Sequence, residues 1–348
     1  MSALRMVLVG LGARGRYWAQ VMHAESACEV VAYVDPSADA VASACTTFGE
    51  RPTFASLEEA LATFDDLDAL VLATPPSGRE AQLRCAAERK LPVLVEKPLA
   101  LDLAEAARYV TLMEEAGVPL MVGLNFRYLA VTMERMRLYR ENAVGSPEFT
   151  RFTYERWRDG YRPGINRYPL TMEHPMLWEQ SIHHFDLLRY VYESEPVQVA
   201  CRAWNPSWSM YAHETNVSAL FTFESGMSAT YQGLWQSGWV TPGFEWRTDC
   251  TEGVVTQFDQ FGELAYARRE QAELTDVPLP AHEIWVTETA GLLRAFVRTV
   301  QEGAPLECSG RDHLGSLAMV QACIEASRDE RVVHVADVLA AVPGGHLP

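Results

Sequence analysis

The stretch Met6–Gly15, MVLVGLGARG, decides the fold of the N-terminal half. Four apolar residues typical of a buried strand run directly into a G-x-G-x-x-G turn, and an amphipathic segment follows. Gly10 permits a tight turn, Gly12 lets the main chain approach a phosphate group, and Gly15 allows helix and strand to pack closely. The pattern predicts a strand, a glycine turn and a helix whose N-terminus can hold phosphates.

Asp35 ends the next apolar run, VVAYVDPS, and supports a dinucleotide as the ligand of this turn. A carboxylate at the end of the second strand can accept hydrogen bonds from both ribose hydroxyls. It would repel a 2′-phosphate, so NAD is favoured; Arg14 and Arg16 keep NADP possible. The alternative is that Asp35 only initiates a turn ahead of Pro36.

Short apolar runs alternate with amphipathic segments as far as Val122. Runs that are apolar throughout are typical of parallel strands buried on both faces. We therefore expect an α/β fold class, with a Rossmann doubly wound parallel sheet in residues 1–123.

The rhythm changes in residues 124–348, which we expect to form a second, α+β domain with a large, open, mostly antiparallel sheet. Residues 215–236 alternate with period two and contain the turn Glu224-Ser225-Gly226, which predicts an antiparallel hairpin. Helices are expected over 176–192, 286–301 and 312–328.

Composition excludes several classes of function. A formal net charge of −17 and a pI near 5.0 disfavour nucleic acid and anionic membranes as partners. No apolar run approaches the roughly 18 residues that span a bilayer, and the N-terminus does not resemble a signal peptide. Seven scattered cysteines without a C-x-x-C pair suit reduced thiols, so a cytoplasmic location is expected.

Two tripeptides follow buried strands and should reach the carboxyl edge of the sheet, where open α/β folds bind ligands. Glu96-Lys97-Pro98 follows Val93-Leu94-Val95, and Thr74-Pro75-Pro76 follows the strand ending near Ala73. A lysine at this edge could favour the alkoxide form of a substrate hydroxyl. Lys97 could equally be an ordinary surface lysine, and the Pro-Pro step a rigid turn.

The segment Glu179–Asp186, EQSIHHFD, carries a candidate proton acceptor. Glu179 and His183 are four residues apart and so share a helix face, which Asp186 continues. A histidine oriented by a carboxylate is a natural base near neutral pH. A surface ion pair or a satisfied core histidine would give the same pattern. Two ligands without a third do not make a zinc site, so no metal is expected.

Residues 156–175 are rich in Pro, Gly, Arg and aromatics, and form either a binding wall or an Ω-loop packed on itself. As a wall, they would supply substrate contacts. The candidates are Arg156, Trp157, Tyr161, Arg162 and Asn166.

With these motifs in place, the chain resembles the Gfo/Idh/MocA family of NAD(P)-dependent oxidoreductases nearly end to end. The resemblance rests on GLGARG at 10–15, Asp35, TPP at 74–76, VLVEKPLA at 93–100, GLNFRY at 123–128, EQSIHHFD at 179–186 and residues 296–335. It implies that nicotinamide and substrate occupy a cleft between the two domains, and that the open sheet builds homodimers or homotetramers. Four tryptophans could supply that interface or pack internally: Trp204, Trp235, Trp239 and Trp246.

The resemblance also implies roles for single residues. Lys97 and His183 would serve the hydroxyl being oxidised, with Glu179 beside them, and Pro98 would help shape the nicotinamide pocket. The cofactor would be held by Gly10, Gly12, Ala13, Arg14, Gly15, Asp35, Thr74, Pro75, Glu96, Lys97 and Asn125. The substrate would contact Lys97, Asn125, Glu179 and His183 as well as the wall.

Three positions depart from the family pattern. Glu179 stands where an aspartate is usual, Arg79 where many members have histidine, and Lys90 where many have glycine. The expected reaction is hydride transfer between a nicotinamide cofactor and a secondary alcohol or ketone of a sugar, inositol or related polyol. Two alternatives stay open: an NAD-dependent glycoside hydrolase on the same scaffold, and a non-catalytic protein that senses the dinucleotide.

Overall fold

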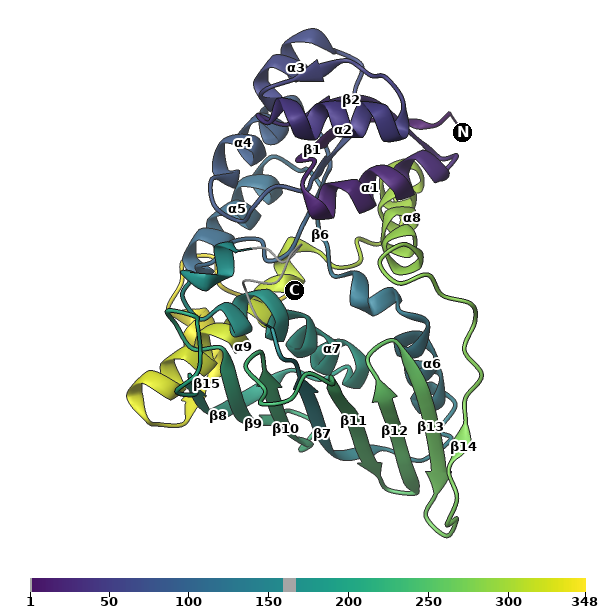
Figure 1. Cartoon of the computed structure of the whole chain (residues 1–348), viewed down its shortest axis with the longest axis vertical. Helices are drawn as coiled ribbons and strands as arrows, with labels where there is room; N and C mark the ends of the chain where they lie inside the picture. The colour runs from purple at the N-terminus through teal and green to yellow at the C-terminus, as the bar shows by residue number, and fades with distance from the viewer. Residues whose placement is uncertain (1, 159–166) are drawn as a thin grey trace. The chain divides into compact units, whose positions relative to one another are not determined.

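The computed structural model describes residues 2–158 and 167–348, which fold into two compact units (Figure 1). The first unit contains the chain up to Tyr128, His282–Leu314 and Val342–Pro348, and the second contains Leu129–Ala281 and Gly315–Ala341. This division differs from the expected boundary after residue 123, since residues 282–314 and 342–348 belong to the first unit. The structure differs because the helix at 287–302 packs on the helix at 13–24 and on residues 125–128.

The first unit has a six-stranded sheet in the order β3-β2-β1-β4-β5-β6, in which every pair is parallel. This confirms the expected doubly wound sheet. The strands are β1 Leu4–Val9, β2 Cys28–Val34, β3 Thr53–Phe54, β4 Ala69–Leu72, β5 Val93–Val95 and β6 Leu120–Val122. The helices are α1 Ala13–Ala24, α2 Ala38–Phe48, α3 Leu57–Thr63, α4 Arg79–Arg89, α5 Leu103–Glu115, the 3₁₀ turn η1 Asn125–Tyr128 and α8 Thr287–Glu302.

The sheet of the first unit consists of apolar strands, as is typical of a parallel sheet that helices cover on both faces. All four residues of β4 are fully buried, as expected of a central parallel strand. Its neighbours β1 and β5 are also almost wholly buried. Because β1, β4 and β5 are parallel neighbours, their carboxyl ends lie together at one edge of the sheet.

The second unit has a nine-stranded sheet in the order β14-β13-β12-β11-β7-β10-β9-β8-β15. Only the pair β7–β10 is parallel, which confirms the mostly antiparallel sheet. The strands are β7 Pro147–Glu155, β8 Pro196–Trp204, β9 Asn216–Phe223, β10 Ser228–Leu234, β11 Gly243–Cys250, β12 Gly253–Asp259, β13 Gly262–Arg268, β14 Thr275–Asp276 and β15 Val333–His334. The helices are α6 Ala130–Arg140, the 3₁₀ turn η2 Tyr168–Leu170, the π-helix η3 Met176–Ser181, α7 Ile182–Tyr192, α9 Gly310–Asp329 and α10 Val335–Ala340.

The expected hairpin is β9–β10, and its alternation decides which face of the sheet is covered. Val217 and Phe221 are fully buried, whereas Leu220 is 48% exposed. Helices α6, α7 and α9 lie on one face of this sheet (Figure 1). The other face is left open by the described parts of the unit.

The helix expected over 176–192 is confirmed, but its first part, residues 176–181, is a π-helix, which the sequence did not predict. The amide of Ile182 bonds to the carbonyl of Leu177, five residues earlier, before regular α-helix resumes. Such turns are rare and occur often at functional sites. This one contains Glu179.

Among the described residues no helix is long and apolar enough to cross a membrane.

Candidate active site

The glycine turn between β1 and α1 has the shape of a phosphate cradle. Gly10 has φ +91°, and a Cβ there would lie 2.7 Å from the carbonyl oxygen of Ala73. A Cβ on Gly15 would lie 2.8 Å from the carbonyl carbon of Gly10, so these two glycines are required by packing. At Gly12 a Cβ would meet nothing within 4 Å. The turn is therefore closed on the protein side and open at Gly12.

The N-terminus of α1 fits the pyrophosphate of a dinucleotide. Gly12 is its N-cap and has no side chain to cap the first amides, and Ala13 is the first helical residue. The first amides of a helix have no partners inside it, and with the helix dipole they attract anions. No acidic residue lies in the first turn of α1 to repel a phosphate.

Asp35, the predicted ribose contact, lies beside the glycine turn. Its Oδ2 accepts the amide of Leu11 at 2.7 Å, within the glycine turn, and its Oδ1 accepts the amide of Ser37 at 2.8 Å. The carboxylate is thus held at the tip of β2, beside the turn. The donor groups and this acceptor together fit a nicotinamide dinucleotide.

Arg14 links the glycine turn to the Glu96-Lys97-Pro98 segment. Its Nε donates to Glu96 Oε1 at 2.6 Å, and the indole of Trp18 donates to the same oxygen at 2.7 Å. Its Nη2 donates to Thr289 Oγ1 at 3.0 Å. The guanidinium of Arg14 thus bonds to two residues of the first unit. A direct contact of Arg14 with the cofactor stays a prediction.

Lys97 follows β5, as expected, and is half-buried. The amide of Glu96 bonds to Leu72 at the end of β4, 2.9 Å away. Thr74 and Pro75 follow that neighbouring strand; Thr74 Oγ1 bonds Gln82, and Pro75 is exposed. The two predicted tripeptides therefore lie on adjacent strand ends.

Arg79 joins these two strand ends, which the sequence did not predict. Its buried guanidinium donates to the carbonyls of Thr74, Pro98 and Leu99. The sequence marked Arg79 only as a departure from the histidine that is usual in the family. The carbonyl partners of its guanidinium could not be inferred from the sequence. Lys90, the other departure in α4, ends the helix in a left-handed conformation, with φ 56°, where glycine is favoured.

Asn125 is buried in η1 and is held by Glu288, a residue that no motif in the sequence indicated. Its Nδ2 donates to Glu288 Oε1 at 3.3 Å. Glu288 is fully buried, its Oε2 lies 3.1 Å from His282 Nε2, and its Oε1 accepts the amide of Trp285 at 2.7 Å. The only signal was an acidic residue in the first turn of an amphipathic helix.

In the second unit, Glu179 lies in the π-helix and His183 is the second residue of α7. His183 is buried, and so is Asp186, whose Oδ1 accepts the hydroxyl of Ser316 at 3.1 Å. Neighbouring His184 is fully buried, and burial, with a smaller effect of the Arg156 charge, lowers its pKa to about 3. His184 is therefore a neutral core histidine.

The predicted substrate wall is described only in part. The guanidinium of Arg156 lies 4.9 Å from the ring centre of Tyr154 and donates to Gln260 at 3.1 Å. Trp157 is 37% exposed. The other three predicted contacts, Tyr161, Arg162 and Asn166, lie outside the described residues.

The four tryptophans divide between the interior and the surface. Trp235 and Trp246 are fully buried and pack internally, so they are not interface residues. Trp204 is half-buried and Trp239 is 68% exposed. In the described ranges, no group of three His, Cys, Asp or Glu side chains could hold a metal ion.

Family models match two segments that together make up more than half of the chain. Residues 4–124 match the oxidoreductase family with an NAD-binding Rossmann fold, and residues 134–256 match the GFO/IDH/MocA C-terminal domain.

Similar proteins cover almost the whole chain. D-apiose dehydrogenase of Paraburkholderia graminis is 26% identical over 97% of this chain and 91% of its own length. Inositol 2-dehydrogenase of Rhizobium meliloti is 23% identical over 96% of this chain and 99% of its own length. An oxidoreductase from Agrobacterium radiobacter, solved with NAD⁺, L-tartaric acid and magnesium, has a TM-score of 0.88 at 20% identity, covering 97% of this chain and 99% of that one.

Proposed function

Because this chain belongs to the Gfo/Idh/MocA family of NAD-binding oxidoreductases, we propose that it oxidises a secondary alcohol of a sugar, inositol or related polyol, or reduces the matching ketone. The observation that carries the proposal is a hydrogen bond in the first unit. Glu96, next to Lys97, bonds at 2.6 Å to Arg14 of the glycine turn. This bond links the segment that carries Lys97 to the glycine turn, which supports a lysine for alcohol chemistry near a turn suited to a dinucleotide.

The bound nicotinamide supplies the hydride acceptor or donor. His183 accepts the proton of the substrate hydroxyl, and the Lys97 ammonium stabilises the negative charge that develops on its oxygen. Glu179 orients His183 or contacts another hydroxyl. NAD is the expected cofactor because Asp35 repels a 2′-phosphate, and NADP is the alternative.

The substrate class is supported by the names of the similar proteins. They include a D-apiose dehydrogenase, inositol 2-dehydrogenases and a 1,5-anhydro-D-fructose reductase. Arg156 and Trp157, with Tyr161, Arg162 and Asn166 beyond the described residues, are proposed to contact the substrate. Arginine and aromatic side chains suit the hydroxyls and the apolar faces of a carbohydrate ring.

The direct test is a panel of D-apiose, inositols and other polyols with NAD or NADP, followed by the absorbance of reduced nicotinamide. His183→Ala should lower kcat by roughly 100- to 10,000-fold, while His334→Ala, at an exposed position, should not. Wild-type turnover in His183→Ala would exclude the assigned base. Cleavage of glycosides without net formation of reduced nicotinamide would indicate the hydrolase instead.

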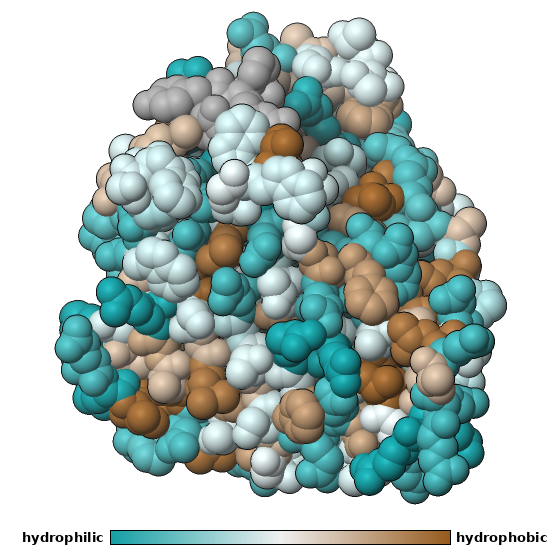
Figure 2. Space-filling model, turned by 60° about the horizontal axis from the view of Figure 1, so that its bottom comes forward, coloured by the Kyte–Doolittle hydropathy of each residue, from teal (hydrophilic) through white to brown (hydrophobic). Residues whose placement is uncertain are grey.

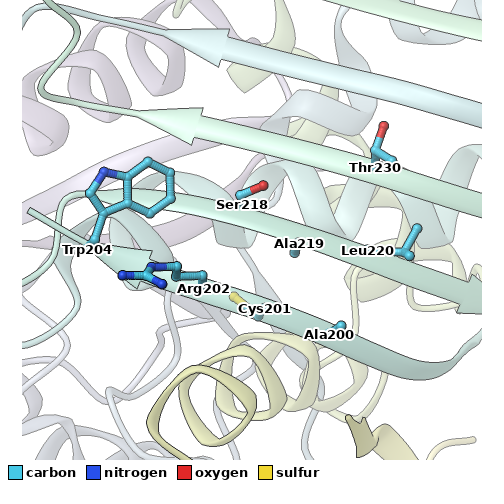
Figure 3. Close-up of a pocket in the computed structure, with 8 residues that line it drawn as sticks. All are labelled: Ala200, Cys201, Arg202, Trp204, Ser218, Ala219, Leu220 and Thr230. Carbon is cyan, nitrogen blue, oxygen red and sulfur yellow. The ribbon is translucent and has the colours of Figure 1, made fainter. Parts of the chain in front are cut away.

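The open face of the second sheet is proposed to form a homodimer or homotetramer. It exposes Phe149 and Leu220, 55% and 48% accessible, and has a hollow of about 680 Å³ over β8, β9 and β10. In that hollow Trp204, Ser218 and Thr230 project to one side of the strands (Figure 3). Figure 2 is turned so that the bottom of Figure 1 comes forward, and it shows hydrophobic residues separated by hydrophilic ones on this surface. Light scattering of wild type and Leu220→Arg should show an oligomer that the variant weakens.

We also propose a cytoplasmic location. All seven cysteines are free thiols, which suits a reducing compartment.

A further inference from the structure

The π-helix before α7 is held by a chain of side-chain hydrogen bonds, which is buried at Tyr231 and partly buried at Gln180. Tyr154 Oη bonds Gln180 Oε1 at 3.2 Å, and Gln180 Nε2 lies 3.0 Å from His184 Nε2. His184 Nδ1 and Ser181 Oγ each lie 2.9 Å from the hydroxyl of Tyr231. The chain thus connects two residues of the π-helix and one of α7 to strands β7 and β10.

One direction of donation satisfies every member of this chain. Because Gln180 Oε1 accepts from Tyr154, its amide nitrogen donates to His184 Nε2. Neutral His184 then carries its proton on Nδ1 and donates it to Tyr231, whose own proton goes to Ser181. A buried network that is fully satisfied in this way favours a single geometry.

Gly233 on β10 provides the room for the Tyr231 ring. A Cβ at Gly233 would lie 2.8 Å from Tyr231 Cζ and would also meet the terminal methyl of Met176, the first residue of the π-helix. The sheet surface is therefore shaped to bring the Tyr231 hydroxyl beneath the π-helix. These hydrogen bonds attach the π-helix to the sheet at Gln180 and Ser181, beside the buried apolar side chains of Met176, Leu177 and Trp178.

A change of register would rotate the residues before Ile182 relative to those after it. Glu179 lies before this point and His183 after it. We propose that Tyr231 is a positioning residue that holds the π-helix and thereby sets the relative orientation of Glu179 and His183. The inference rests on the proposed function, in which these two side chains serve the substrate hydroxyl.

The test compares Tyr231→Phe with Tyr192→Phe. Tyr192 ends α7 and is a matched control, because its hydroxyl also bonds buried side chains, Thr248 at 2.6 Å and Trp246 at 2.9 Å. Since misplacement by about 1 Å can cost on the order of 100-fold, Tyr231→Phe should lower kcat at least about tenfold. Its KM for NAD should stay within about twofold, and Tyr192→Phe should change neither. Equal effects of the two variants on kcat would overturn the proposal.

Hydrogen exchange gives a readout that does not need a substrate. The amide of Ile182, which makes the π bond to Leu177, should exchange at least about tenfold faster in Tyr231→Phe than in Tyr192→Phe. Equal exchange rates contradict a role of Tyr231 in holding the turn. Should Tyr231→Phe not fold, Ser181→Ala removes one bond of the same hydroxyl and should show the same pattern. If His183→Ala keeps full turnover, the proposed function fails, while the exchange data still decide what holds the π-helix.

Discussion

The guanidinium of Arg79 donates a hydrogen bond to the main-chain carbonyl of Thr74 at 2.5 Å. The same buried group also donates to the carbonyls of Pro98 and Leu99. One cation at the start of α4 therefore ties the segment after β4 to the segment that carries Lys97.

Replacement of Arg79 by methionine should lower the free energy of unfolding by about 2 to 5 kcal/mol, because the buried carbonyls of Pro98 and Leu99 and the part-buried carbonyl of Thr74 lose a donor. Urea denaturation followed by circular dichroism measures this change. Arg84→Met on the same helix is the control, since its exposed pair with Glu80 contributes at most about 0.5 kcal/mol. Equal losses in both variants would show that Arg79 is not a link.

Gly12 and Gly15 should respond differently to alanine. At Gly15 the new Cβ meets the main chain of Gly10, so stability should fall by about 1 to 3 kcal/mol. At Gly12 the space is open and φ is −63°, so stability should change by less than about 0.5 kcal/mol. The Gly12 methyl group would nevertheless face the bound pyrophosphate and weaken NAD binding at least about tenfold. Thermal unfolding and calorimetric titration with NAD measure the two effects; unchanged affinity in Gly12→Ala would place the pyrophosphate elsewhere.

Asp35 should control the choice between NAD and NADP. Asp35→Ser removes the charge at the tip of β2, so the ratio of kcat/KM for NADP to that for NAD should rise at least about tenfold. Asp39→Ser, at an exposed acidic position in the first turn of α2, should leave the ratio unchanged. Steady-state kinetics with both cofactors decide the point, and an unaltered ratio in Asp35→Ser would refute the assigned ribose contact.

His184 should make the fold sensitive to acid. Burial, followed by the charge of Arg156, lowers its pKa to about 3 in the folded state, against 6.5 for an ordinary histidine. As pH falls below 6.5 only the unfolded chain takes up this proton, so folding loses stability until the pH nears the folded value. From pH 6.5 to about 4.5 this loss amounts to roughly 2 to 3 kcal/mol.

The comparison of His184→Gln with wild type isolates this contribution. The variant should lose less stability than wild type over the same pH range, as measured by urea denaturation at each pH. Substitution of exposed His334 by glutamine should leave the wild-type pH dependence intact. Parallel curves for His184→Gln and wild type would mean that the buried histidine is not the group responsible.

The positions of several candidate site residues in the fold could be predicted because their signals are local. The glycine turn, Asp35 and the Glu96-Lys97-Pro98 tripeptide each follow an apolar strand directly, and parallel strands bring their carboxyl ends to one edge. The alternation of residues 215–236 likewise determines a hairpin, because a period of two assigns each side chain to one face.

The remaining features depend on contacts between residues that are distant in the sequence. Arg14 meets Glu96 across 82 residues, and residues 282–314 return to the first unit to place Glu288 beside Asn125. The π-helix around Glu179 likewise depends on Tyr231 and on the absence of a side chain at Gly233, both on a strand that comes later in the chain. The sequence by itself determined the strands and helices of the parallel sheet and the edge at which the candidate residues lie, since both follow from local periodicity. Only the tertiary structure decided how those side chains are held, because their hydrogen-bond partners are chosen by packing.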